Sequence, residues 1–324
     1  MKVAIVVNDR RRVERLLARK ELGTWAPAYL WATRWEEMCV DNLIPFEIFD
    51  SFDPDFIGKL MAYNPDRTLW RSIGNTLMKF KDEMQRQALD KSNLRIVPNW
   101  RTHYLYDHKI RQTYLFNLHG IPHPETKVCF NEPYALAYAE RAKYPFVVKA
   151  DGGAGGKSFR FVETKEQALE IIDNIFHKRG KWTGREHEKS VFYAQEYIAA
   201  SGVWRIWMFK DKVAVGMFVN NAEGTLKASG AGKMSYLPVP AEVLDMAMKI
   251  NQGLGFDWCM YDIIRCTKRK EYLVLETTDT VSDRDRKNRK ETIHREGNDW
   301  IPRPGRLTPP EIIFNLFVLE EMEK

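Results

Sequence analysis

The chain has 324 residues, of which 44% are hydrophobic and 29% are charged, a composition typical of soluble globular proteins. No apolar run approaches the ~18 residues that span a membrane, and the N-terminal run lacks the apolar core and cleavage site of a signal peptide. These observations predict a cytoplasmic protein without a membrane partner. The net charge of +6 allows an acidic or phosphorylated ligand without requiring nucleic acid.

The first part of the chain alternates short apolar runs with helical patterns. Strands are expected at 3–7, 45–49 and 95–99, and helical periodicity covers 26–41 and 68–90. This alternation predicts an open α/β lobe with a parallel sheet. Because ligands on such lobes bind beyond the carboxyl ends of the strands, residues 8–12 form a candidate edge of the site.

A helical bridge over 100–125 leads through the turn GIPHPET into a second unit of strands and helices. Its strands are expected at 126–129, 145–149, 158–162 and 191–198, and its helices at 131–142 and 164–178. Between the last helix and the last strand, residues 178–188 are expected to be exposed and mobile.

The last third is predicted to hold four strands and two helices. The strands are expected at 203–209, 212–219, 258–265 and 271–277, and the helices at 239–254 and 309–322. Residues 220–233 form a loop. Residues 282–305 carry heavy charge without periodicity, which predicts a solvated or disordered loop.

The four cysteines stand apart in the sequence and form no CxxC pair. This spacing favours small buried hydrophobic residues over a zinc site or disulfides. They are Cys39, Cys129, Cys259 and Cys266.

The most informative stretch is YPFVVKADGGAGGKS at 144–158, an apolar strand that ends in Lys149 and a glycine-rich loop. Glycine reaches positive φ at low cost and lets backbone N–H groups wrap an anion. The alternative is a solvent-exposed hairpin turn. Nothing in 158–162 begins a helix, so the loop returns into a strand, unlike a P-loop. The loop contains Gly152, Gly153, Gly155, Gly156, Lys157 and Ser158.

Two carboxylates interrupt apolar strands near the end of the chain. Asp262 lies in WCMYDIIR, and Glu276 lies in YLVLETTD on the next strand. Adjacent antiparallel strands can bring these side chains together, where Mg²⁺ would neutralise them alongside phosphate oxygens. The alternative is that each carboxylate pairs with a nearby lysine or arginine.

These signals follow one another in a characteristic order: Lys109 before a helix, Lys149 and the glycine-rich loop, the strand ending QEYI, the arginine of VWRIWMF, then the two carboxylates. In this order the chain resembles the ATP-grasp superfamily, and within it the carboxylate–amine ligases of the glutathione synthetase and RimK-like group. The resemblance implies an ATP-grasp fold of mixed α/β (α+β) class. It divides the chain into an N-terminal α/β domain at 1–100, a small subdomain with the lid at 101–198 and a metal-binding subdomain at 199–324.

The resemblance also implies roles for individual residues. Lys109 and Lys149 match the lysines that reach the nucleotide phosphates, and residues 151–158 match the lid over them. Arg205 matches the arginine that steadies an acyl phosphate. The residues that match the adenine-binding hinge and the apolar residue against the adenine face are Gln195, Glu196, Tyr197, Ile198 and Leu275.

The implied reaction is ATP-dependent formation of an amide bond through an acyl phosphate, with release of ADP and phosphate. Its implied cofactors are ATP and Mg²⁺, and its substrates are a small-molecule or peptide carboxylate and an amine. Lysines, an arginine and Mg²⁺ would stabilise the charge on the transferring oxygens. Arg205, Lys149 and Lys233 are the expected catalytic residues, and Asp262, Glu276 and Thr278 the expected metal ligands.

The chain departs from the family pattern at three places. Thr278 stands where asparagine is usual among the metal ligands, and Asp279 is an alternative ligand if the strand end bends. Trp204 stands where an acidic ribose contact is often found, so Glu196 is a candidate for that contact. The second arginine of the RimK-like group is absent from GMFVNN, which leaves its charge to Lys227 or Lys233.

Two other classes of function stay open from the sequence. A small-molecule kinase on the same fold would use the basic run at 284–290 to hold a phosphorylated substrate, and a nucleotide-binding protein without turnover would fit the Thr278 departure. Nucleic acid is a poor candidate partner because no aromatic residues are interleaved with the basic run. Homo-oligomerisation is an open alternative.

Overall fold

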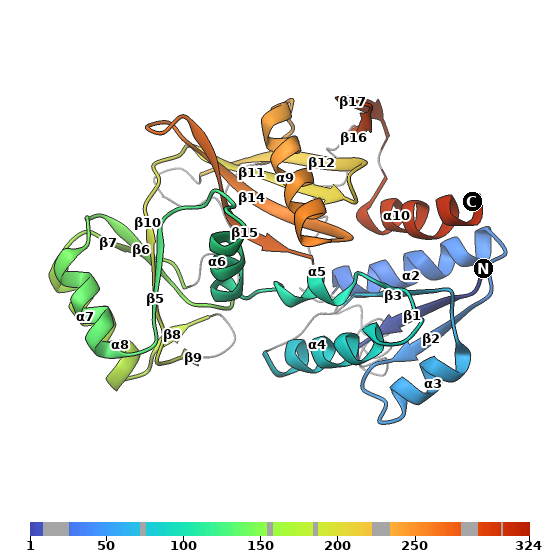
Figure 1. Ribbon diagram of the computed structural model, residues 1–324, viewed down its shortest axis with the longest axis horizontal. Coiled ribbons are helices and arrows are strands. Elements are labelled where there is room, and N and C mark those ends of the chain that lie inside the picture. The colour runs from blue at the N-terminus through green and yellow to red at the C-terminus, as the bar shows by residue number, and fades with distance from the viewer. Residues whose placement is uncertain are drawn as a thin grey trace.

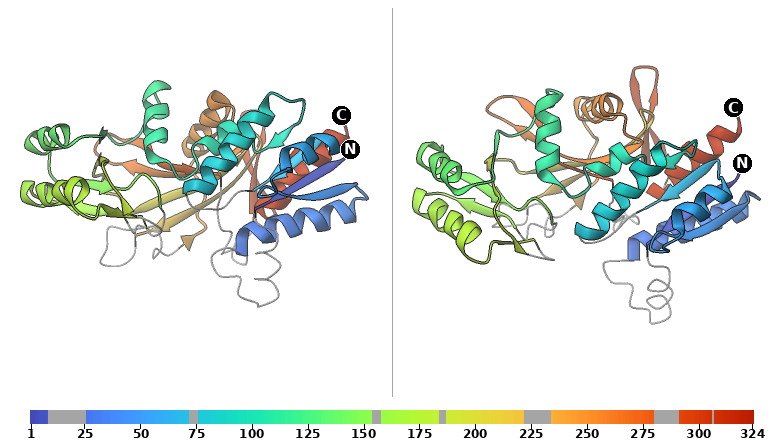
Figure 2. Two further views of the ribbon diagram at one scale, coloured as in Figure 1. Left: turned by 90° about the horizontal axis from the view of Figure 1, so that it is seen from below. Right: turned by 60° about the horizontal axis from the view of Figure 1, so that its bottom comes forward.

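The computed structural model describes residues 1–8, 26–71, 76–153, 158–183, 187–221, 234–279, 291–305 and 307–324, with side chains described from position 31 in the second of these segments and from position 78 in the third. Three main sheets carry the structure (Figure 1). The N-terminal lobe lies at one end of the elongated molecule and the second sheet at the other (Figure 2). No described helix is long and apolar enough to cross a bilayer.

The N-terminal lobe is the predicted parallel α/β unit. Its sheet has the order β2-β1-β3-β4, and all three pairings are parallel. The strand β1 is buried along its whole length, which explains its unbroken apolar sequence. The elements are β1 (Val3–Val7), α2 (Ala26–Asp41), β2 (Phe46–Asp50), α3 (Phe56–Tyr63), β3 (Arg67–Trp70), α4 (Thr76–Asp90) and β4 (Ile96–Val97).

One helix prediction in this lobe was wrong at its start. Residues 67–70 form β3, and α4 begins only at Thr76. Leu69 and Trp70 are fully buried beside β1, because their apolar side chains fit a central strand as well as a helix. A short apolar run cannot be assigned by periodicity alone.

The bridge consists of two helices, and the second sheet follows it. This antiparallel sheet has the order β5-β10-β6-β7. Side chains of α7 and α8 pack on it around the buried Phe146, Ile172 and Phe192. The elements are α5 (Trp100–Tyr104), α6 (Lys109–Leu118), β5 (Thr126–Cys129), α7 (Glu132–Arg141), β6 (Phe146–Lys149), β7 (Arg160–Val162), α8 (Lys165–His177) and β10 (Phe192–Glu196).

The described residues of the segment 178–188 include regular secondary structure. It contains the paired strands β8 (Lys181–Trp182) and β9 (His187–Glu188). Lys181 is buried because its ammonium donates hydrogen bonds to the carbonyls of Lys149 and Val191. The prediction of an exposed segment is therefore wrong at Lys181, whereas Trp182 is 43% exposed.

The third sheet is antiparallel and has the order β15-β14-β11-β12-β16-β17, with β13 paired to β12. Helix α9 packs on one of its faces around Leu244 and Ala247. The elements are β11 (Gly202–Phe209), β12 (Val213–Asn220), β13 (Met234–Ser235), α9 (Ala241–Leu254), β14 (Trp258–Cys266), β15 (Glu271–Thr278), β16 (Glu291–Glu296) and β17 (Asp299–Pro304). Residues 291–304 thus form a hairpin, and the prediction of a structureless loop was wrong there.

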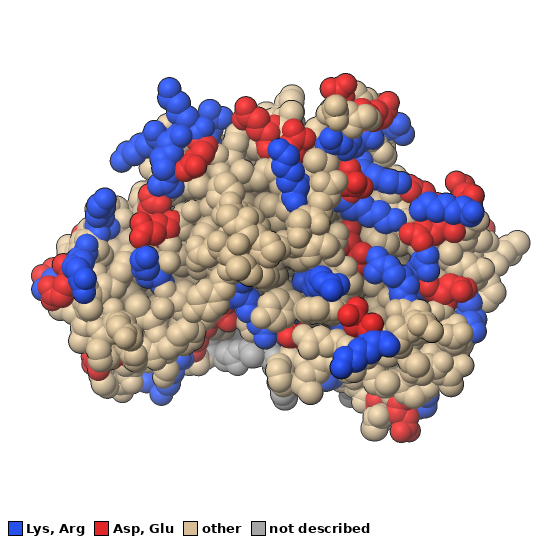
Figure 3. Space-filling view, in the orientation of Figure 1, with Lys and Arg blue, Asp and Glu red and all other residues tan. Residues whose placement is uncertain are grey.

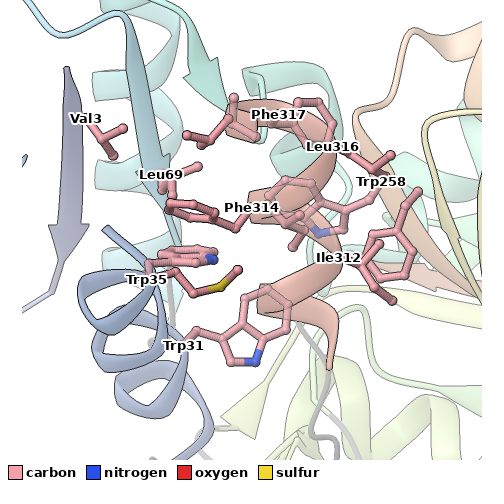
Figure 4. Close-up of a cluster of buried hydrophobic side chains, with 14 of the residues drawn as sticks. Val3, Trp31, Trp35, Leu69, Trp258, Ile312, Phe314, Leu316 and Phe317 are labelled. Atoms are coloured by element: carbon pink, nitrogen blue, oxygen red, sulfur yellow. The ribbon is translucent and has the colours of Figure 1, made fainter. Parts of the chain in front are cut away.

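The C-terminal helix joins the N-terminal lobe to the third sheet. The run α10 (Pro309–Phe314), η2 (Asn315–Leu319) and α11 (Glu320–Met322) lies beside α2. Figure 4 shows Phe314 and Phe317 between Leu69 and Trp35 of the lobe and Trp258 of the sheet. The indole N–H of Trp35 donates to the carbonyl of Pro310 at 3.0 Å. The single apolar cluster fixes the lobe against the sheet.

The four cysteines behave as predicted. All are buried and none forms a disulfide. Burial raises the pKa of the Cys39 thiol to about 12, which keeps it protonated and unreactive.

Candidate functional site

Three neighbouring strands of the third sheet place three charged side chains in one line. Arg205 of β11 lies opposite Asp262 of β14, and Asp262 lies opposite Glu276 of β15. The guanidinium of Arg205 donates to both carboxylate oxygens of Asp262, from Nε and Nη2, each at 2.9 Å. The attraction of Asp262 raises the pKa of Arg205 further. We call these three residues the charged row.

A bulge in β15 shapes this face of the sheet. The pairing shifts between Asp262 and Ile263, and Leu275 has no partner across the strands. An extra residue of this kind turns neighbouring side chains to the same face. Leu275 packs on the cluster of Ile264 and Leu273, on the face that carries Asp262 and Glu276. One strand therefore supplies both an apolar and an acidic site residue.

Two lysines from other elements reach this region. Lys109, the first residue of α6, places its Nζ 3.1 Å from Oε1 of Glu276. Burial alone lowers the pKa of Lys109, but the attraction of Glu276 and Asp107 outweighs it and raises the pKa overall. Lys149 ends β6 and donates to Oε1 of Gln195 at 2.6 Å. Burial lowers the pKa of Lys149 to about 8.

The charged row fits a magnesium ion that also binds phosphate. Mg²⁺ prefers one or two carboxylates together with phosphate oxygens, and Asp262 and Glu276 offer that donor set. The ion pairs with Arg205 and Lys109 match the alternative interpretation of the sequence, and they leave lone pairs on each carboxylate. Lys109, Lys149 and Arg205 outnumber the two carboxylates, so the site suits an anionic ligand.

Thr278 is the last residue of β15, and Asp279 follows it. Thr278 is opposite Met260, one row beyond Glu276 on the same face. Asp279 places Oδ2 2.9 Å from Nδ1 of His103, and both side chains are buried. In the described part of the chain no three His, Cys, Asp or Glu side chains form a metal-binding group, so Asp279 does not join Asp262 and Glu276.

The base of the glycine-rich loop is tightly held. Gly153 has φ +97°, and a Cβ there would lie 2.2 Å from the carbonyl oxygen of Thr183. Its N–H donates to Oδ1 of Asp107 at 2.7 Å. Only glycine fits this position. Ser158 lies in the turn before β7, whereas Gly155, Gly156 and Lys157 lie outside the described residues.

The sequence analysis missed the residues that anchor this loop. Asp107 forms an ion pair with Lys79 of α4, in which Oδ2 of Asp107 is 2.7 Å from Nζ of Lys79, and both side chains are buried. Directly after Asp107, the ring Nδ1 of His108 lies 2.9 Å from Oδ2 of Asp151, and the N–H of Ile110 donates to Oδ1 of Asp151 at 2.8 Å. The polar pair Asp107–His108 directly before Lys109 was the available signal, because polar residues at a helix start often bind nearby backbone groups.

The hinge residues divide into two pairs. Gln195 and Glu196 belong to β10, where their backbone pairs with β5 and β6. Both carboxylate oxygens of Glu196 accept hydrogen bonds. Arg269 donates to Oε1 at 2.7 Å, and the N–H of Glu125 donates to Oε2 at 3.3 Å. Tyr197 and Ile198 follow the strand, and Ile198 packs on the same cluster as Leu275. The structure thus brings together the two apolar residues predicted to meet adenine.

Several predicted residues do not meet the charged row. Trp204 lies on the opposite face, where it packs near α9 and its ring centroid is 5.0 Å from that of Phe218. Asn8 binds Asp82 and Ser51 in the N-terminal lobe. The remaining candidates lie outside the described residues: 9–12, Lys227, Lys233 and 284–290. On the face in Figure 3, basic side chains are mixed with acidic ones.

Comparison with known families agrees with this arrangement. Residues 108–194, from the helix start at Lys109 to the strand before the hinge, match the family described as phosphoribosylglycinamide synthetase, ATP-grasp (A) domain. This part of the chain is similar to an ATP-grasp domain. The fold predicted from the order of the sequence signals is therefore confirmed.

Individual proteins extend the comparison. The chain is 26% identical over 172 residues to the α-aminoadipate–LysW ligase LysX of Saccharolobus solfataricus, over 52% of this chain and 60% of the relative. The match thus spans less than two thirds of that relative.

Solved structures share the fold over most of the chain. A RimK domain ATP-grasp protein of Sphaerobacter thermophilus superimposes with a TM-score of 0.55 at 18% identity, covering 88% of this chain and 93% of its own. The ATP-grasp ligase PsnB, solved with a minimal precursor, Mg and ADP, gives a TM-score of 0.56 at 14% identity, covering 87% and 90%. These structures share the ATP-grasp fold with the chain.

The lowered pKa of Lys149 predicts a pH dependence of nucleotide binding. The ammonium is present below pH 8 and is lost as the pH rises through about 8, and only the ammonium attracts phosphate. The affinity for MgADP should therefore fall above that pH. In the Lys149→Arg variant the side chain stays positively charged as the pH rises, so the affinity for MgADP should depend less on pH. Calorimetric titration from about pH 6.5 to 9.5 measures both proteins; an unchanged fall in Lys149→Arg would assign the effect to another group.

The anchor of the glycine-rich loop predicts a second effect. Asp107→Asn removes the charge that pairs with Lys79, and Lys79→Met removes the ammonium, so both should loosen Gly153. We expect about tenfold weaker MgADP binding, the size of a lost charged hydrogen bond. Arg95→Met is the matched control, because it breaks the ion pair with Asp257 away from the loop. Equal losses of affinity in all three variants would show a general loss of stability.

Proposed function

We propose that this protein is an ATP-dependent ligase that joins a carboxylate to an amine through an acyl phosphate. The observation that carries the proposal is the charged row of Arg205, Asp262 and Glu276, with Lys109 and Lys149 beside it. The relatives support it, because LysX and PsnB are both described as ligases. We also propose that residues 1–100 form an N-terminal α/β domain and that residues 101–198 and 199–324 are the two subdomains that clasp ATP.

The site residues would share the work of phosphoryl transfer. Lys109 and Lys149 would bind the nucleotide phosphates, and the loop that begins at Gly152 would cover them. Tyr197, Ile198 and Leu275 would hold adenine at the hinge. Preorganised cations of this kind stabilise charge that develops in a transition state. Each ammonium is already held in the site by a partner, Lys109 by Glu276 and Lys149 by Gln195.

Magnesium would bind at Asp262 and Glu276 and would reduce the negative charge of the phosphates. Arg205 is held against Asp262 in two places, so its direction is fixed before a substrate arrives. It would steady the acyl phosphate while the amine attacks the carbonyl carbon and phosphate leaves. Thr278, one row away, would be a weaker oxygen ligand than the usual asparagine.

The proposal predicts that ADP and phosphate appear together only when both a carboxylate and an amine are supplied. The first test is an ADP-release screen of amino-acid pairs and small carboxylates with MgATP. A protein that phosphorylated its substrate and released no free phosphate would be a kinase instead. ADP release that needed no amine and gave no amide would also contradict the proposal.

Variants locate the activity in the site. Lys149→Met and Glu276→Gln should each reduce kcat by about 100-fold or more, as for loss of a group that stabilises transition-state charge. Lys165→Met is the matched control, because Lys165 pairs with Glu140 on the exposed surface of the same subdomain. Full activity in Lys149→Met or Glu276→Gln would disprove the site assignment.

A further inference from the structure

The strand that carries Glu276 and Thr278 has one side without a neighbouring strand. Among the strands that the structure describes, β15 pairs only with β14, so it lies at the edge of the third sheet. Backbone groups on the outer side of an edge strand need other partners when they are buried. The bridge supplies them. Helix α6 lies against β15 (Figure 1), and the N–H of Val274 donates to the carbonyl of Pro122 at 2.9 Å.

Gln112 of α6 is the partner of Thr277, the residue between Glu276 and Thr278. Its Oε1 accepts from the N–H of Thr277 at 3.0 Å, and its Nε2 donates to the carbonyl of Thr277 at 2.8 Å. A side-chain amide offers the same kinds of donor and acceptor as a peptide group, so Gln112 takes the place of a neighbouring strand. Gln112 is 2% exposed and Thr277 is 0% exposed, so water does not compete for these hydrogen bonds.

The two hydrogen bonds fix the backbone on both sides of Thr277. Its N–H belongs to the peptide group that follows Glu276, and its C=O belongs to the peptide group that precedes Thr278. Because a peptide group is planar, it can rotate only as a rigid unit between its two Cα atoms. With both peptide groups held, Glu276 and Thr278 keep the directions in which their side chains leave the strand.

The same helix also holds the side chain of Glu276. Lys109 and Gln112 are three residues apart, which places them on neighbouring positions of one side of α6. Nζ of Lys109 lies 3.1 Å from Oε1 of Glu276. Gln112 is fixed in turn, because its Nε2 also donates to the carbonyl of Leu105 at 2.9 Å. One side of α6 thus holds both the carboxylate of Glu276 and the backbone beside it.

We propose that Gln112 is a positioning residue for the magnesium site, which holds β15 so that Glu276 and Thr278 share the face of the charged row before the metal binds. The inference rests on the proposed function, in which Mg²⁺ binds at Asp262 and Glu276. A strand that is already fixed loses little conformational freedom when its ligand arrives. Residues that orient metal ligands therefore contribute strongly to metal affinity.

The Mg²⁺ dependence of ADP binding tests this role without turnover. ADP is titrated by calorimetry into the full chain with Mg²⁺ and with EDTA, and the ratio of the two affinities measures the contribution of the metal. Gln112→Met keeps the length of the side chain and removes its hydrogen bonds. The ratio should fall about tenfold, as on loss of a group that orients a metal ligand. The affinity for ADP in EDTA should stay unchanged, which also shows that the variant is folded.

Asn251→Leu is the matched control. Asn251 of α9 is 1% exposed, and its Nδ2 donates to the carbonyls of Met208 and Lys210, away from the charged row. This variant should lower the Tm without changing the Mg²⁺ ratio. If Gln112→Met does not fold, the isosteric pair Gln112→Glu and Asn251→Asp, which removes only the donated hydrogen bonds, is measured in the same way with the same expectation.

Three results would overturn the proposal: a Mg²⁺ ratio in the Gln112 variants equal to that of the wild type, an equal fall in the Asn251 variants, or ADP binding by the wild type that does not respond to Mg²⁺. The outcome is separable from that of the proposed function. If the ratio falls as expected but no carboxylate and amine release ADP, the positioning role stands and the ligase proposal fails. If amide formation is found but the Gln112 variants keep the ratio, the ligase proposal stands and the positioning role fails.

Discussion

The site depends on the side-by-side pairing of β11, β14 and β15. This pairing sets Arg205 opposite Asp262 and Asp262 opposite Glu276, although 71 positions separate the first residue from the last. Two carboxylates this close would repel each other without the guanidinium of Arg205 and the ammonium of Lys109. In the proposed function the same cations would attract the phosphates of the nucleotide. Stability of the unliganded site and the proposed affinity for phosphate would then have one electrostatic origin.

The surrounding elements keep this line of charges in place. The C-terminal helix packs between the N-terminal lobe and the third sheet. In addition, Lys79 of α4 in that lobe forms an ion pair with Asp107, and Asp107 accepts a hydrogen bond from the N–H of Gly153. The start of the glycine-rich loop is therefore linked to the N-terminal lobe through two polar contacts. A change in how the lobe packs would be felt where the phosphates are expected to bind.

Much of this arrangement was predictable from the sequence because the signals were local and ordered. The strand ending in Lys149, the glycines after it and the two carboxylates in apolar strands each have a direct physical meaning. The bulge at Leu275 was not predictable, because strict alternation would put Leu275 and Glu276 on opposite faces. The hairpin at 291–304 was missed because its outer strand is mostly exposed and its charged, proline-containing sequence resembles a loop. The Lys79–Asp107 contact joins residues 28 apart, and no periodicity reports such a pair.

A crystal structure of the full chain with Mg²⁺ and a non-hydrolysable ATP analogue tests the central claim most directly. The account predicts the phosphates over the charged row, within hydrogen-bonding distance of Lys109, Lys149 and Arg205, and the metal bound by Asp262 and Glu276. It also predicts adenine against Ile198 and Leu275. A nucleotide bound elsewhere, or one whose phosphates avoid Arg205, Asp262 and Glu276, would contradict it.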